Sequence, residues 1–168
     1  MQSSTSIRMA LIVAVIFVPG STQAADLAVL PGLMAGTSPK PAFGVVIGHA
    51  PSVAGFEIEY LGTTGRKTVN RSVAGGIFGN LIVQPVMVGR LQPFAIAGFG
   101  MWGETFENGG TGEMSARDIG GGIKVWLTDH LRLRLDYRLF LLGDADDGSR
   151  LPSTTRPRRI SAGVHVAF

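Results

Sequence analysis

The clearest pattern of hydrophobic and polar positions in the chain lies at residues 131–142, which read LRLRLDYRLFLL. Over four consecutive pairs the odd positions are apolar and the even positions charged, with Leu131, Leu133, Leu135 and Tyr137 opposite Arg132, Arg134, Asp136 and Arg138. A period of two is that of a β-strand, whereas a helix would distribute the arginines around all its sides. In a soluble sheet these leucines would face a core. In a membrane barrel they would face lipid and the arginines would face the lumen.

Most of the chain consists of similar short, glycine-rich segments, and it contains no convincing amphipathic helix. In the segment at 68–86, Gly75, Gly76 and Gly79 predict bends or bulges. The facing of the segment at 92–104 stays open. Together with 131–142, the predicted strands are residues 26–36, 42–50, 53–62, 68–86, 92–104, 115–127 and 158–168.

The connections alternate between tight turns, near residues 51, 89 and 129, and longer polar loops, near 38, 65, 110 and 150. This asymmetry and the even strand number are typical of outer-membrane barrels, which have their turns in the periplasm and their loops outside. The strands are near the roughly 9–11 residues that a tilted strand needs to cross a bilayer, and a sheet in lipid has to close. The pattern predicts an all-β fold, an eight-stranded antiparallel up-and-down transmembrane β-barrel.

The N-terminal segment has the features of a secretory signal peptide. Arg8 gives a positive charge, Met9–Val18 is an apolar run, Pro19 and Gly20 break it, and Ala24 suits cleavage. The run is too short to span a membrane as a helix. We therefore expect a signal peptide at 1–24, a barrel at 25–168, and the cell outer membrane as the destination.

The composition indicates how the protein is stabilised and which kind of partner it lacks. The chain has no cysteine, so a large core or a closed barrel in lipid has to supply the stability that disulfides give other secreted chains. The formal net charge is +3 and the charges are scattered, which does not indicate a nucleic-acid partner.

The C-terminus distinguishes the two kinds of barrel. A soluble barrel could bind an apolar ligand, but it has no reason to end on an exposed Phe168 with apolar residues at every second position before it. On an outer-membrane chain such an ending resembles the signal that the barrel-insertion machinery reads. We expect this machinery, outer-membrane lipid and lipopolysaccharide as partners, and the insertion signal to comprise Ile160, Val164, Val166 and Phe168.

Four motifs in order resemble the outer-membrane β-barrel domain family, the small OmpA-like or opacity-type barrels of Gram-negative bacteria. They are GFEIEY (55–60), PFAIAGFG (93–100), GGGIKVWLTDHLRLRLDYR (120–138) and RRISAGVHVAF (158–168). The resemblance covers most of the chain after residue 25 and implies an eight-stranded barrel in the outer membrane. It implies no particular activity, because members differ in their loops and a fold does not fix a function.

Charged residues at the alternate strand positions that would point into the barrel are candidates for a network in the lumen. The interior of an eight-stranded barrel is only just filled by side chains, which favours an internal ion-pair plug over a narrow pore or gated ion path. We expect Glu57 or Glu59 to pair with an arginine of 131–142. The candidates are Glu57, Glu59, Asp118, Lys124, Arg132, Arg134, Asp136, Arg138 and Arg159.

Aromatic residues are candidates for the girdles that membrane barrels carry at the two lipid–water interfaces. The alternative is that they are scattered strand residues without a common role. The candidates are Phe43, Phe56, Tyr60, Phe94, Trp102, Tyr137 and Phe168.

No motif indicates a cofactor, a metal or catalysis. Residues 98–103 match GxGxxG, but no helix follows, as a dinucleotide site requires. Residues 144–148 resemble part of a calcium loop, but Gly148 falls at the fifth position and no glutamate closes the loop. His49, His130 and His165 are predicted near the periplasmic side and show no triad.

The sequence thus favours a non-enzymatic outer-membrane barrel with a structural or surface-interaction role, external loops that vary, and no cofactor. A lipid A-modifying outer-membrane enzyme and a narrow porin-like channel remain alternatives.

Overall fold

The computed structural model describes residues 25–36, 39–51, 53–63, 73–105, 111–145 and 156–168. The predicted signal peptide, most of the longer polar loops and the calcium-like residues 146–148 lie outside these ranges. The described residues form eight β-strands: β1 (Asp26–Ala35), β2 (Lys40–His49), β3 (Ala54–Thr63), β4 (Val73–Val83), β5 (Leu91–Thr105), β6 (Thr111–Trp126), β7 (Leu131–Ala145) and β8 (Arg158–Ala167).

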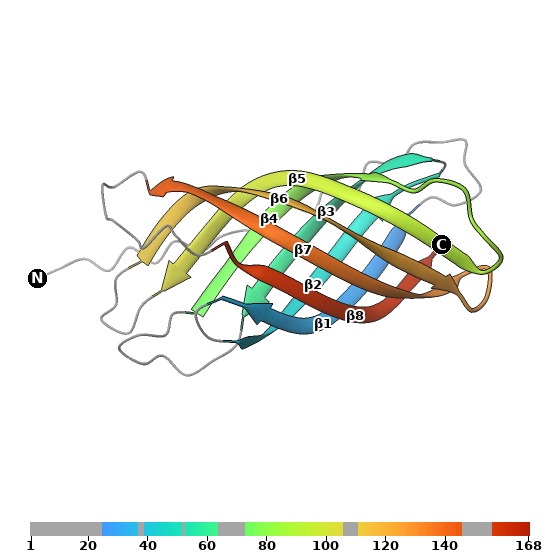
Figure 1. Ribbon diagram of the computed structural model, residues 1–168, viewed down its shortest axis with the longest axis horizontal. Coiled ribbons are helices and arrows are strands. Elements are labelled where there is room, and N and C mark those ends of the chain that lie inside the picture. The colour runs from blue at the N-terminus through green and yellow to red at the C-terminus, as the bar shows by residue number, and fades with distance from the viewer. Residues whose placement is uncertain (1–24, 37–38, 52, 64–72, 106–110, 146–155) are drawn as a thin grey trace, which may run out of the picture.

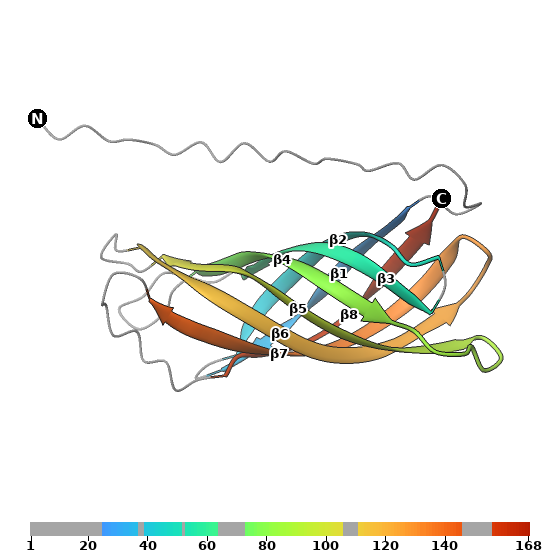
Figure 2. The ribbon, with the colours of Figure 1, turned by 90° about the horizontal axis from the view of Figure 1, so that it is seen from above.

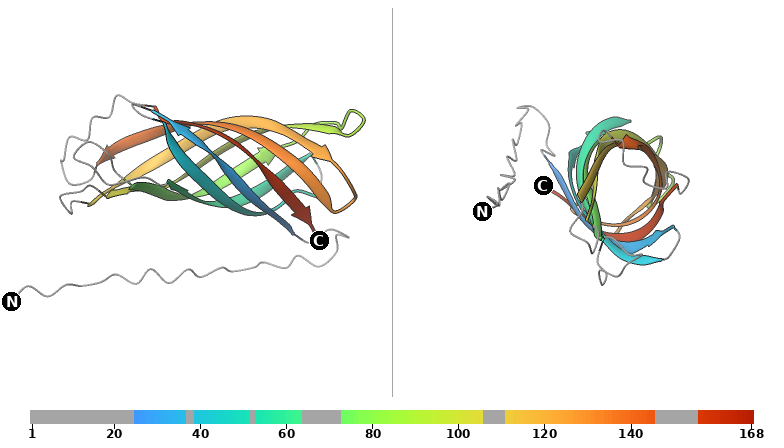
Figure 3. Two further views of the ribbon diagram at one scale, coloured as in Figure 1. Left: turned by 90° about the horizontal axis from the view of Figure 1, so that it is seen from below. Right: turned by 90° about the vertical axis from the view of Figure 1, so that its left-hand side faces the viewer.

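Each strand pairs antiparallel with the next, and β8 pairs with β1, so that the sheet closes into a barrel (Figure 1). Seen along its axis, the strands form a closed ring (Figure 3). The predicted all-β, eight-stranded, up-and-down antiparallel barrel is confirmed. None of the described residues belongs to a helix long and apolar enough to cross a membrane.

The strand register is staggered around the barrel. Following paired residues once around the ring leads from Leu141 back to β7 at Leu131, a displacement of ten residues. Such a stagger tilts the strands against the axis, typically by about 35–45°. The pairs run from Leu141 through Arg117, Phe99, Gly79, Ile58, Ile47, Leu27 and Val166 to Leu131.

The two ends of the barrel differ. The short connections after β2, β4 and β6 lie at one end together with Phe168, and we call this the turn end (Figure 2). The opposite end, where β3, β5 and β7 finish, is the loop end. At the turn end Gly89 has φ 62° between Val88 and Leu91, whose backbone groups bond in both directions at 2.8 and 3.0 Å. A two-residue hairpin loop with a left-handed glycine at its first position has the pattern of a type II′ turn.

Inward and outward positions alternate along most of each strand, as the pattern at 131–142 predicts. On β7 the arginines are buried, whereas Leu133, Leu135 and Tyr137 are 43–55% exposed. The outer face of the barrel is therefore a broad apolar surface. The facing of β5 is now settled: Phe94 and Trp102 point inward and Phe99 outward. The interpretation of Phe94 and Trp102 as girdle residues is wrong.

The structure moves two expected strand boundaries into predicted loops and lacks the bulges expected in β4. β6 begins at Thr111 and β7 continues to Ala145, so strand replaces part of two predicted loops. Nor does β4 contain a bulge at its glycines, because its registers with β3 and β5 run without interruption. Gly76 instead makes room, since a Cβ there would meet the Phe78 ring and the Met101 carbonyl. A register shift does occur between Met114 and Ala116, where β6 pairs with β7.

Candidate functional site

The barrel interior gathers all nine charged residues expected in a lumen network. They come from β3, β6, β7 and β8, and each is at most 3% exposed. Their inward direction follows from strand parity, and their proximity follows from the narrow bore of an eight-stranded barrel. A buried charge has to be paired, so the contacts among them decide whether the lumen is filled or open.

Arg138 lies at the centre of the network. Its Nη1 is 2.7 Å from Glu59 Oε2 and 2.9 Å from Asp118 Oδ2, and its Nε donates to Asp136 Oδ1 at 3.1 Å. Arg159 from β8 contacts the other oxygen of Glu59. Three carboxylates from three strands thus converge on one guanidinium, which is the geometry of a tightly paired ionic cluster.

Asn80 extends the cluster to β4. With its amide oriented to satisfy both ends, it donates to Asp118 Oδ1 at 2.9 Å and accepts from Arg138 Nη1 at 3.0 Å. The sequence places this residue on the inward parity of its strand. As an uncharged residue it was not among the network candidates.

Arg134 forms a second centre, nearer the turn end. It donates from Nη1 and Nη2 to the two oxygens of Glu57 at 2.7 and 3.0 Å, and from Nη2 to Asp136 Oδ2 at 2.8 Å. Its guanidinium lies 4.5 Å from the centre of the Phe94 ring. Asp136 therefore bridges the two arginine centres, and both Glu57 and Glu59 pair with arginines of β7.

The turn end of the lumen is closed by a further polar layer. Lys124 donates to Gln84 at 3.0 Å. Asp26 of β1 lies 3.3 Å from His165 Nε2 and 3.7 Å from Arg132, whose guanidinium stacks 3.7 Å from the Trp126 ring centre. Asp26 was missed at the sequence level, although its parity on β1 would have identified it as inward-facing.

The loop end of the lumen is filled by apolar side chains instead. Phe78, Trp102 and Phe140 are at most 2% exposed, with ring centroids 5.3–6.4 Å apart and tilted or edge-on packing. This arrangement is favourable for aromatic rings. Leu61 and Met34 belong to the same cluster. The interior thus consists of a polar layer, an ionic layer and an aromatic plug in sequence along the axis.

Glycine at position 44 leaves the space that the ionic layer occupies. A Cβ there would meet Glu59 Oε1 and Arg159 Nη1. We expect Gly44→Ala to displace this ion pair and to lower the free energy of unfolding by about 1–3 kcal/mol, the range for overpacking. Urea titration followed by tryptophan fluorescence measures it. Gly79→Ala is the matched control, because nothing lies within 4 Å of its added Cβ. Equal stability of the two variants would show that the ionic layer has room to spare.

The three histidines do not form a catalytic group. His165 faces Asp26 in the lumen, His130 Nδ1 lies 3.1 Å from the Ala167 carbonyl in a turn, and His49 packs on Phe56 at the outer face. In the described ranges no group of three or more potential ligands could hold a metal ion. Residues 98–103 lie within β5, so the GxGxxG match has none of the helical context that a dinucleotide site needs.

No protein-family model matches the chain, and no curated protein matches it in sequence. Solved structures do. The Neisserial surface protein NspA has a TM-score of 0.69 at 14% identity, covering 86% of this chain and 96% of NspA. The N-terminal β-barrel domain of OprF from Pseudomonas aeruginosa has a TM-score of 0.64 at 16% identity, covering 85% of this chain and 97% of the domain.

The chain has the fold of the eight-stranded outer-membrane barrels. A designed transmembrane β-barrel is also similar, with a TM-score of 0.56 at 13% identity, covering 89% of this chain and 98% of the design. This confirms the fold expected from the resemblance to small OmpA-like barrels. Because the design shares the fold, the eight-stranded barrel specifies no natural ligand or activity.

Proposed function

We propose that the protein is a closed, non-conducting barrel of the outer membrane whose role is structural or lies in surface interaction at its loop end. The loop end faces the cell exterior and the turn end the periplasm. The likeness to outer-membrane barrels, the apolar outer face and the filled lumen support this proposal.

The height of the apolar outer face fits a bilayer. The outward residues of β7 from Leu131 to Leu141 are all apolar and lie ten residue steps apart. At about 3.3 Å per residue and a tilt of about 40°, this stretch covers about 25 Å along the axis. Apolar bands of outer-membrane barrels are about 25 Å tall. We call this zone the belt.

The single observation that carries the non-conducting part of the proposal is the filling of the lumen. Arg134, Arg138 and Arg159 are fully buried and ion-paired at its middle, and Phe140 packs against Phe78 and Trp102 above them. An ion would have to displace both layers to pass.

Conductance measurements test this proposal. We expect the folded wild-type protein to give no stepwise current in a planar bilayer in concentrated salt, because both lumen layers stay in place. A larger porin in the same bilayer serves as the positive control, and a shift in gel mobility on boiling verifies that the sample is folded. Regular current steps from folded wild-type protein would contradict the proposal and favour the porin-like channel.

The proposal includes export and assembly. A signal peptide at 1–24 directs the chain out of the cytoplasm, and the barrel-insertion machinery reads the last strand. Ile160, Val164, Val166 and Phe168 all point outward, with 37–64% exposure, which makes them accessible to such a factor. Outer-membrane lipid and lipopolysaccharide surround the inserted barrel. Cell fractionation tests this part, and recovery in the soluble fraction would overturn it.

A further inference from the structure

Three outward-facing arginines interrupt the apolar outer face at the loop end of the belt. Arg117 on β6 pairs with Leu141, and Arg158 on β8 pairs with Leu139, so the two arginines stand on either side of β7. Arg156 precedes Arg158 on the same outer parity and is also exposed. No ion pair joins any of the three to another described residue.

The cluster is confined to one side of the barrel. Because the register shifts by ten residues around the barrel, heights along the axis are compared after allowing for this shift. At the height of Arg117, the outward residues of β1, β2, β4 and β5 are, in that order, Leu33, Phe43, Ile77 and Met101. All four are apolar. A general attraction of arginines to lipid head groups would give a ring of charges, whereas this barrel concentrates them on β6 and β8.

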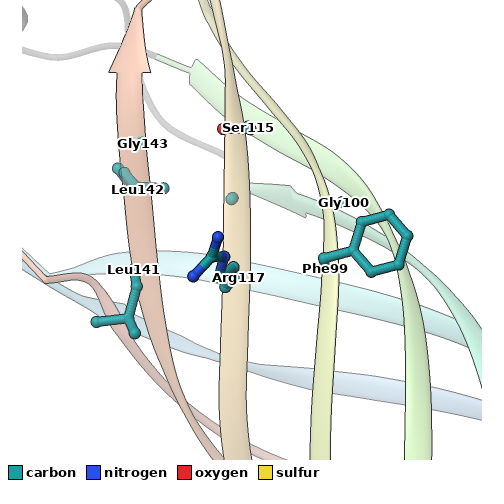
Figure 4. A pocket seen from close by; sticks show the side chains of 8 residues that line it. Phe99, Gly100, Ser115, Arg117, Leu141, Leu142 and Gly143 are labelled. Carbon is teal, nitrogen blue, oxygen red and sulfur yellow. The ribbon is translucent and has the colours of Figure 1, made fainter.

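A groove accompanies the charges. It has a volume of about 590 Å³ and lies across the outer faces of β5, β6 and β7 (Figure 4). Phe99 and Leu141 flank Arg117 as its cross-strand neighbours. Ser115 precedes it on the same face, beside the register shift of β6. Gly143 of β7 belongs to its lining, and a Cβ at this position would meet the Ser115 hydroxyl oxygen.

The position of the groove along the barrel axis determines which chemical groups of a ligand can reach it. Arg117 lies beside Leu141, about 20–25 Å from the turn-end edge of the belt, where hydrocarbon gives way to head groups. An arginine at this level keeps its stem on apolar surface and its charge among the head groups. A ligand there has apolar chains below and anionic groups above.

We propose that the outer face of β5–β8 binds one lipid A-type lipid, an acylated head group with two phosphates. One phosphate bonds Arg117 and the Ser115 hydroxyl, the other bonds Arg158 and Arg156, and an acyl chain lies along Phe99 and Leu141. The two cationic positions are separated by two strand spacings, about 10 Å, and by two residues along the strands, about 7 Å, so they lie about 12 Å apart, which suits two phosphates rather than one. This inference rests on the proposed membrane location and adds a specific lipid to it.

Native mass spectrometry of the full chain, released from detergent micelles, tests the site with purified bis-phosphorylated lipid A as the probe. We expect one bound lipid on the wild-type protein. Arg117→Gln with Arg158→Gln should weaken binding at least tenfold, and Ser115→Ala should weaken it by a smaller factor. Arg90→Gln is the matched control, because Arg90 is exposed at the turn end. It should leave binding unchanged.

Two further lipids separate specific binding from general attraction. Lipid A with a single phosphate should bind more weakly than the bis-phosphorylated form, and phosphatidylglycerol more weakly still. Equal binding of all three, or of the double variant and the wild type, would overturn the inference. Mobility shifts on boiling and insertion into vesicles are measured on the same samples. Failure to insert would overturn the proposed function and this inference together, whereas insertion with unaltered lipid A binding by the variants would overturn the inference alone.

Discussion

Arg138→Met is expected to lower the free energy of unfolding by about 5 kcal/mol, at the upper end of the range for breaking a buried ion pair. Methionine fills a similar volume but removes the cation on which Glu59, Asp118 and Asp136 converge. Glu59 and Asp136 would then depend on Arg134 and Arg159, and Asp118 would lose its ion pair. Urea titration of the barrel in lipid vesicles, followed by tryptophan fluorescence, measures the change.

Two controls accompany this prediction. Arg90→Met removes the same charge from an exposed turn and should change stability by no more than about 0.5 kcal/mol. Arg134→Leu alone should be strongly destabilising, but Arg134→Leu combined with Glu57→Leu should recover part of the loss, because it leaves no unpaired charge from that pair. If Arg138→Met unfolds like the wild type, water has to hydrate the lumen carboxylates and the ionic layer is not a dry plug.

Leu135→Arg should cost about 2–4 kcal/mol for the protein inserted in a bilayer. Leu135 is 55% exposed on the outer face, in the middle of the belt, between Ile123 and Ala162 on the neighbouring strands. An arginine there would have to place its guanidinium in hydrocarbon or reach past several apolar residues. Equilibrium unfolding from vesicles measures the cost.

A leucine at another height along the barrel axis provides the control for Leu135→Arg. Leu127 is 44% exposed beyond the end of β6, outside the belt, and Leu127→Arg should cost about 0–1 kcal/mol. If Leu135→Arg and Leu127→Arg are equally tolerated, the outer face of β7 does not contact hydrocarbon.

The alternation of polar and apolar residues along the strands made most of the fold predictable. Over residues 56–60 of β3, 131–139 of β7 and 159–166 of β8 the polar and apolar positions alternate, so the inward direction of Glu57, Arg134 and Arg159 followed from the sequence. On β5 the rule failed, because Phe94, Ile96 and Trp102 face a lumen that is itself apolar in places. Polarity distinguishes the two faces of a strand only where the two environments differ.

The contact partners of the lumen side chains were harder to predict from the sequence than the direction in which each side chain points. Glu57 and Arg134 lie on β3 and β7, which are not neighbours in the sheet, so their contact depends on the stagger accumulated around the whole ring. The sequence predicted an acid of β3 with an arginine of β7, but not which one. The aromatic plug was missed because Phe140 breaks the alternation of β7, and its partners come from β4 and β5.

The distribution of charge along the chain has a consequence for the order of assembly. The carboxylates of β3 emerge early in synthesis, whereas their arginines follow 77 and 100 residues later on β7 and β8. An unfinished sheet of the first six strands therefore has acidic residues on the concave side and none of the arginines that neutralise them. Such long sequence separations slow folding. The last hairpin supplies both the closing edge of the sheet and the neutralising cations, so closure of the barrel and pairing of the buried carboxylates depend on the same two strands.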